Sequence, residues 1–107
     1  MNESINPRTM AAREPASGPA DIRRLAGRFK QVSDLTRLSV LLLLGDGERS
    51  VGDLSAATGS SMTALSRHLA LLRLVGLVVP RRDGQRNVYA LTETGRGLRR
   101  VIVGVAG

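Results

Sequence analysis

Apolar residues recur every three or four positions along the first part of this chain. In residues 21–32 they fall on one face and the basic side chains lie elsewhere, which predicts an amphipathic helix. A second run, up to Leu44, is apolar on nearly every face and follows the capping residues Ser33 and Asp34. It predicts a buried central helix that ends at the glycine-rich turn 45–47.

Two further helices are predicted, separated by three residues. Ser50 can cap a helix over 51–58, and we expect Leu54 and Ala57 to point inward from it. The next helix, 62–75, has a polar and basic outer face. Its predicted buried stripe is Leu65, Leu69, Leu72 and Val75. A helix, a three-residue turn and a helix form the helix-turn-helix arrangement, whose second helix can enter the major groove of DNA.

Further along, the apolar pattern changes to the short runs typical of strands. Residues 77–79 and 88–91 predict two strands, and residues 81–87 predict the hairpin tip between them. Asp83 and Gly84 are the expected turn residues. Three arginines lie at this tip, so we expect a basic wing on which like charges repel one another unless an anion neutralises them.

The two ends of the sequence differ from its middle. Residues 1–20 hold three prolines and show no apolar periodicity, so we expect a flexible N-terminal arm followed by one folded unit over 21–107. Residues 92–106 predict a last helix with an apolar stripe. Either the chain's own core or a subunit interface can cover such a stripe.

Composition narrows the possible chemistry. The 107 residues give room for one domain and include no cysteine and a single histidine, which excludes disulfides, thiolate metal sites and cysteine nucleophiles. We also expect no enzyme, since no nucleophile with its base, carboxylate pair or phosphate-binding loop stands out. The longest apolar run, 40–44, is too short to cross a membrane and the first residues lack a signal-peptide pattern, so we expect a soluble, cytoplasmic protein.

The charge of the chain is positive and unevenly distributed. The formal net charge is +7, and residues 61–107 hold eight of the 16 basic side chains but only two of the nine acidic ones. This excess predicts an anionic partner. Two other classes stay open: a winged-helix module that binds protein, and a basic RNA-binding protein, although the chain has few aromatic side chains for base stacking.

Several motifs occur in the order and spacing of a known family. The runs FKQVSDLTRL (29–38), ERSVGDL (48–54) and SRHL with LR and GLV (66–78) resemble the winged helix-turn-helix repressors of the ArsR/SmtB family, over about residues 21–91. The resemblance implies a mainly α fold with a small β-hairpin wing. It also implies a homodimeric, nucleoid-associated repressor of an inverted-repeat operator. The first and last helices would form the dimer interface, here at Ile22, Leu25, Phe29, Leu98, Val101, Ile102 and Val105.

The resemblance also implies which side chains meet double-stranded DNA. The recognition helix, about 62–75, would enter the major groove, and the wing, 80–88, would follow the backbone or the minor groove. The matching positions are Ser61, Met62, Thr63, Ala64, Ser66, Arg67, His68, Arg81, Arg82, Gln85 and Arg86. Arg67 is best suited to a base contact, because a guanidinium binds a guanine edge at two points. For His68 we predict a phosphate contact or a local polar contact.

The metal sites of the family have no counterpart in this sequence. One family site needs cysteines near residues 48–54, where this chain has Ser50 and Gly52. The site on the last helix needs histidine and carboxylate ligands, and none follows Glu93. We therefore expect no metal ligand and no cofactor.

Overall fold

The computed structural model describes residues 19–107, so the arm expected over residues 1–20 lies outside the described residues except for its last two. Pro19 and Ala20 already belong to the first helix, α2 (Pro19–Val32), which was predicted to begin at Asp21. Proline suits the first turn of a helix, because the N–H that it lacks has no intrahelical acceptor there.

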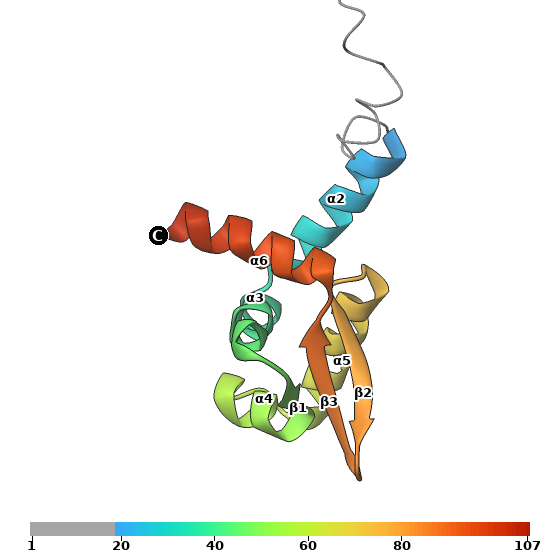
Figure 1. Cartoon of the computed structure of the whole chain (residues 1–107), viewed down its shortest axis with the longest axis vertical. Helices are drawn as coiled ribbons and strands as arrows, with labels where there is room; N and C mark the ends of the chain where they lie inside the picture. The colour runs from blue at the N-terminus through green and yellow to red at the C-terminus, as the bar shows by residue number, and fades with distance from the viewer. Residues whose placement is uncertain (1–18) are drawn as a thin grey trace, which may run out of the picture.

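The remaining elements follow the predicted order of helices and hairpin. They are α3 (Leu35–Leu43), the 3-10 turn η2 (Leu44–Asp46), β1 (Arg49–Ser50), α4 (Val51–Thr58), α5 (Met62–Leu74), β2 (Val78–Asp83), β3 (Arg86–Leu91) and α6 (Glu93–Ala106). Figure 1 shows α3, α4 and α5 beside the β2–β3 hairpin, with α2 and α6 at the end of the molecule opposite the hairpin tip.

Four helices begin at a side chain that caps them. Asp34, Ser50, Ser61 and Thr92 each accept a hydrogen bond from the backbone N–H three residues further on. The predicted caps of α3 and α4 are thereby confirmed, and three residues separate α4 from α5 as the helix-turn-helix pattern requires.

The core is built mainly of leucines from α3, α4 and α5. The predicted stripe of α5 is confirmed, with Val75 at its end only partly buried. The fully buried side chains are Val40, Leu41, Leu54, Leu65, Leu69, Leu72 and Leu77. The expectation that Ala57 points inward is wrong: α4 touches the core through Val51 and Leu54, whereas Ala57, near the end of this short helix, is exposed.

The wing is longer and more regular than predicted. Strands β2 and β3 pair from Val78 opposite Leu91 to Asp83 opposite Arg86, so Arg81 and Arg82 lie within a strand. The turn is therefore Gly84 with Gln85, and Gly84 has a φ of 64°. The predicted pair Asp83 and Gly84 was one residue too early, since Asp83 still belongs to the ladder.

A third strand, β1, was not predicted. Its two residues pair with β3, with Arg49 opposite Tyr89 and Ser50 opposite Val88, which gives the sheet order β1-β3-β2. This pairing attaches the wing to the start of α4, because Ser50 is also the cap of that helix.

Helix α6 starts in very close contact with the end of α5. Thr92 donates through Oγ1 to the carbonyl oxygen of Gly76 at 2.6 Å, and its N–H donates to that of Leu77 at 3.0 Å. Gly95 lies at this point, and a Cβ atom there would overlap the carbonyl oxygen of Leu77. The chain therefore requires glycine at position 95 for packing.

Gly95→Ala should lower the free energy of unfolding by at least about 2 kcal/mol, because the added methyl group overlaps a backbone carbonyl. Gly104→Ala is the matched control on the same helix, where a Cβ atom meets nothing within 4 Å. That change should be neutral or stabilise by up to about 1 kcal/mol. Urea unfolding followed by circular dichroism measures both, and equal effects would contradict this account.

Candidate nucleic-acid interface

The predicted contact residues at the start of α5 share its outer face. Because Leu65, Leu69 and Leu72 fix the inner face of this helix, the positions between them are turned outward. Ser61, Met62, Thr63, Ser66 and Arg67 are exposed, and Ala64 is half-buried.

Arg67 lies in the middle of this outer face. Its guanidinium makes no hydrogen bond or ion pair with any residue in the range 19–107. The side chain is therefore available to a ligand outside the described chain. Ser61 is partly used inside the protein, since its Oγ accepts from the N–H of Ala64 at 3.1 Å.

His68 turns away from the outer face and joins α5 to the α2–α3 junction. Nη1 of Arg37 lies 2.8 Å from Nδ1 of His68, and Oδ1 of Asp34 lies 3.9 Å from the same atom. A guanidinium can only donate, so Nδ1 of His68 is the acceptor in this contact. Nε of Arg37 also donates to the carbonyl oxygen of Gln31 at 2.6 Å. Of the two roles predicted for His68, this geometry provides the local polar contact.

The wing arginines have partners within the chain. Arg81 binds Glu48 through two contacts of 2.6 Å, and Arg86 lies 3.4 Å from Asp83. Nη1 of Arg82 donates to Oδ1 of Asn87 at 3.1 Å. Two of the three like charges thus face an anionic group of the chain itself, the carboxylate of Glu48 or of Asp83.

The hydrogen bonds between Arg81 and Glu48 shift the pKa of both groups. The hydrogen bonds from Arg81 lower the pKa of the Glu48 carboxyl group, and those to Glu48 raise the pKa of the Arg81 guanidinium. Glu48 was not among the predicted functional residues. Its place beside the wing depends on strand β1, whose two residues leave no recognisable strand pattern in the sequence.

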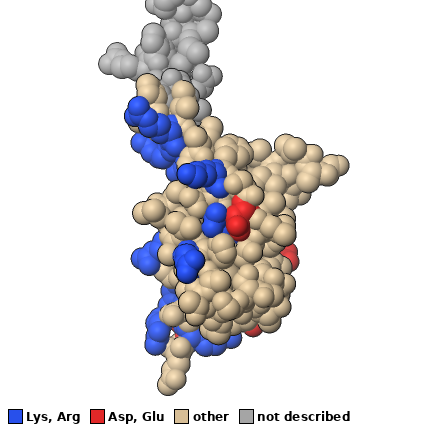
Figure 2. Space-filling view, turned by 180° about the vertical axis from the view of Figure 1, so that it is seen from behind, with Lys and Arg blue, Asp and Glu red and all other residues tan. Residues whose placement is uncertain are grey.

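A hollow of about 390 Å³ lies between α4, α5 and the wing tip. It brings together the recognition-helix residues Met62 and Ser66 and the wing residues Gln85 and Arg86, as sequence reasoning expected of one DNA-facing surface. Figure 2 shows basic side chains along one edge of the molecule, from α2 down to its lower end, with few carboxylates on that face.

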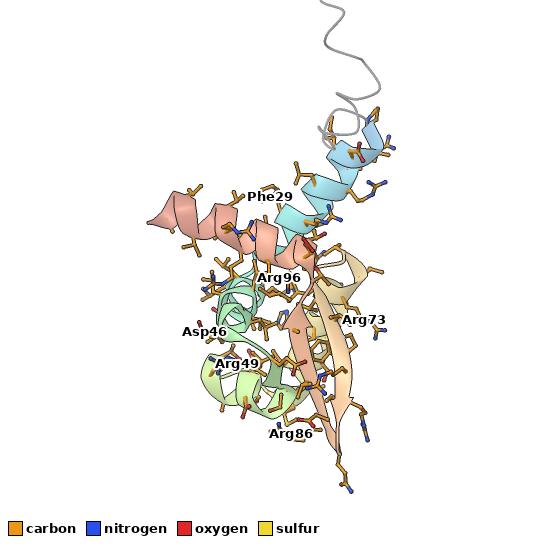
Figure 3. All side chains as sticks on the ribbon, in the orientation of Figure 1. Phe29, Asp46, Arg49, Arg73, Arg86 and Arg96 are labelled. Carbon is orange, nitrogen blue, oxygen red and sulfur yellow. The ribbon has the colours of Figure 1, made fainter. Side chains whose placement is uncertain are left out.

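Several arginines serve the fold instead of a charged surface. Each donates to a backbone carbonyl at or near the end of a helix or strand. The donor and acceptor pairs are Arg28 to Val75, Arg37 to Gln31, Arg49 to Leu43, Arg96 to Leu91 and Arg99 to Leu42. Figure 3 shows Arg96 near α6, at the end of the molecule away from Arg86 on the hairpin. The excess charge of residues 61–107 is thus not confined to the candidate DNA surface.

The residues predicted for a dimer interface lie on α2 and α6 but differ in exposure. Leu98 is 8% exposed and belongs to the core of the chain, and Ile102 packs against that core. The exposed members are Ile22, Leu25, Phe29, Val101 and Val105. Between the two helices lies an apolar hollow of about 330 Å³, whose lining includes Leu25, Phe29, Leu98 and Val101. Figure 3 places Phe29 on the side of α2 that faces α6.

Metal binding and membrane insertion were also considered for the described part of the chain, residues 19–107. Over residues 19–107, no group of three or more His, Cys, Asp or Glu side chains is arranged to hold a metal ion. Within the same range, no helix combines the length and apolar character needed to span a bilayer.

Comparison with known proteins identifies the fold and the family. A solution structure of a homodimeric winged helix-turn-helix DNA-binding domain from Mycobacterium bovis, described as a possible ArsR-family regulator, superposes with a TM-score of 0.74 and 35% identity, covering 81% of this chain and 82% of that one. The fold is that of a winged helix-turn-helix regulator. Residues 34–79 match the arsR family of bacterial regulatory proteins. The chain belongs to this family.

Two curated relatives show how far the similarity extends. The transcriptional activator HlyU of Vibrio cholerae is 45% identical over 66 residues, 62% of this chain and 61% of that protein. The arsenical resistance operon repressor of Escherichia coli is 46% identical over 65 residues, 60% of this chain and 56% of that protein. The matched part thus spans little more than half the length of these relatives.

The cap of α3 provides a test of pH dependence. The N–H of Arg37 donates to Asp34 at 3.0 Å, and this hydrogen bond lowers the pKa of the Asp34 carboxyl group. Because the folded pKa lies below the unfolded value of about 3.9, the stabilisation is complete above that pH and is lost as the pH falls through the folded pKa. Asp34→Ala should therefore lower the melting temperature by several degrees at pH 7, and the difference from wild type should shrink below about pH 4.

Thermal unfolding monitored by circular dichroism between pH 2 and pH 7 measures this difference. Asp46→Ala removes an aspartate whose side chain is 80% exposed, and should change the melting temperature little at any pH. A deficit of Asp34→Ala that stays constant down to pH 2 would contradict the assignment.

Proposed function

We propose that the protein is a transcriptional regulator that binds double-stranded DNA as a homodimer. The observation that carries this proposal is the outer face of α5, which is polar, exposed and held in place by three fully buried leucines, next to a basic wing. Family membership supports the same function. Named relatives include an activator and a repressor, and we propose repression at an inverted-repeat operator from the resemblance to the ArsR/SmtB repressors. Such a protein acts in the cytoplasm, on the nucleoid.

The N-terminal half of α5 lies in the major groove in this proposal. Arg67 binds the O6 and N7 atoms of a guanine, the contact for which a guanidinium has the right geometry. The hydroxyl groups of Ser61, Thr63 and Ser66 bind phosphates and base edges at close range. Met62 and Ala64 make apolar contacts with the DNA. His68 supports the helix from behind through Arg37.

The wing follows the DNA backbone or the minor groove. Arg82 has no carboxylate partner among the described residues, and the contact of Arg86 with Asp83 is long, at 3.4 Å. Both guanidinium groups can therefore bind phosphate. Gln85 lies at the turn between the two strands. Such contacts release condensed counterions, so affinity falls steeply with salt.

The second copy of the chain covers the apolar faces of α2 and α6. A pair of recognition helices then meets successive major grooves about 34 Å apart, which is the geometry of an inverted repeat. Leu25, Phe29 and Val101 are exposed together around one apolar hollow, and a contiguous apolar surface of this kind is typical of an interface.

Arg67→Ala should weaken operator binding by about 10- to 100-fold and reduce the preference for operator over scrambled duplex. The matched control is Arg73→Ala, an exposed arginine in the last turn of the same helix, which should cost little. DNA that co-purifies with the protein supplies the operator, and fluorescence anisotropy against operator, scrambled duplex and single-stranded RNA gives the affinities. Equal losses for both variants, or a preference for RNA, would count against the proposal.

Phe29→Glu should convert the dimer to a monomer, because it places a charge in the apolar hollow between α2 and α6. Leu74→Glu is the control: Leu74 is 80% exposed and lies on α5 outside this hollow. Analytical ultracentrifugation at micromolar concentration distinguishes the two states. A wild-type protein that is monomeric both free and on DNA would refute the homodimer.

A further inference from the structure

The ion pair of Glu48 and Arg81 spans the wing sheet. Glu48 immediately precedes β1, while Arg81 lies in β2, and β3 runs between these two strands. The two side chains therefore meet across the middle strand and connect the outer strands of the sheet. Since β1 leads directly into α4 through the cap Ser50, the pair fixes the wing to the helix that packs against α5.

All three nitrogens of the Arg81 guanidinium are engaged within the chain. Nε and Nη2 each donate to one carboxylate oxygen of Glu48 at 2.6 Å, and Nη1 donates to the carbonyl oxygen of Arg82 at 3.3 Å. Parallel two-point binding of this kind is the strongest geometry for an arginine and a carboxylate. Arg86, by contrast, has one contact of 3.4 Å with its carboxylate, and Arg82 has a neutral partner.

We propose that Glu48 is a positioning residue for DNA binding, which keeps Arg81 away from the phosphates and sets the wing at a fixed angle to the recognition helix. The proposal rests on the DNA-binding function proposed above. It reassigns Arg81 from a DNA ligand to a structural support, and it leaves Arg82 and Arg86 to carry the phosphate contacts of the wing.

Charge balance gives the reason. A paired Arg81 and Glu48 carry no net charge, so their approach to the duplex releases no counterion. If Arg81 turned to a phosphate, the Glu48 carboxylate would be left unpaired at the DNA surface, where it would repel the same backbone. One attraction would be gained and one repulsion added, so the pair stays closed in the complex.

The experiment measures the slope of log affinity against log salt concentration for operator DNA. Neutralising Arg82 with Arg82→Gln should reduce the slope by about 0.9, the value of one lost phosphate contact. Arg81→Gln leaves the Glu48 carboxylate unpaired near the DNA and should lower the slope as well, whereas the double variant Glu48→Gln with Arg81→Gln, which removes both charges of the pair, should leave the slope unchanged. Glu48→Gln should increase it by about 0.9, because the freed Arg81 then binds a phosphate, and should strengthen binding to scrambled duplex several-fold at low salt.

Two controls separate this effect from a general loss of negative charge or of structure. Asp46→Asn also removes one carboxylate, but at the end of η2, away from the wing (Figure 3), and should leave the slope unchanged. The double variant Glu48→Gln with Arg81→Gln should return to the wild-type slope, since the extra contact needs Arg81. Circular dichroism melts confirm that each variant is folded at the assay temperature.

The proposal is overturned if the double variant lowers the slope as much as Arg82→Gln does, or if Glu48→Gln and Asp46→Asn behave alike. Should Glu48→Gln alone unfold, the comparison of the double variant with Arg82→Gln still decides the question, because the double variant leaves neither charge of the pair without its partner. Failure of the wild-type protein to bind any duplex is a different result, which refutes the proposed DNA-binding function itself.

Discussion

The burial of one row of leucines on α5 determines which side chains of this helix face outward. Leu65, Leu69 and Leu72 of α5 have no exposed surface, and they pack with the buried leucines of α3 and α4. Successive residues of a helix are turned by a constant angle, so fixing these three side chains fixes the direction of every other side chain on α5. The same contact that stabilises the core thus aims Arg67 and its neighbours outward.

Arginine has two separate roles in this chain, and only one of them concerns a charged ligand. The last turn of a helix leaves carbonyl oxygens without intrahelical donors, and cations near them are favourable. Arg99 and Arg49 donate to two such oxygens at the end of α3, and Arg28 donates to one at the end of α5. A net charge of +7 therefore overstates the charge available for binding nucleic acid.

Sequence reasoning succeeded where the signals are local and failed where they depend on distant contacts. Caps such as Ser50 and the spacing of leucines lie within a few residues, so the helices and their buried faces could be predicted. Strand β1 exists only because Arg49 and Ser50 meet β3, some forty residues later. The partner of Arg81 could not be seen for the same reason, and the turn was misplaced because the pairing of Val78 with Leu91 sets the register of the hairpin.

The absence of a side chain at Gly95 has a mechanical consequence. The start of α6 rests directly on the carbonyl of Leu77, and Thr92 ties it to the residues that end α5. At Gly95, no side chain of α6 lies between its backbone and the Leu77 carbonyl. The backbone of α6 therefore meets the backbone of Leu77 directly, and a substitution at position 95 would have to displace the chain between α5 and β2 instead of a flexible side chain.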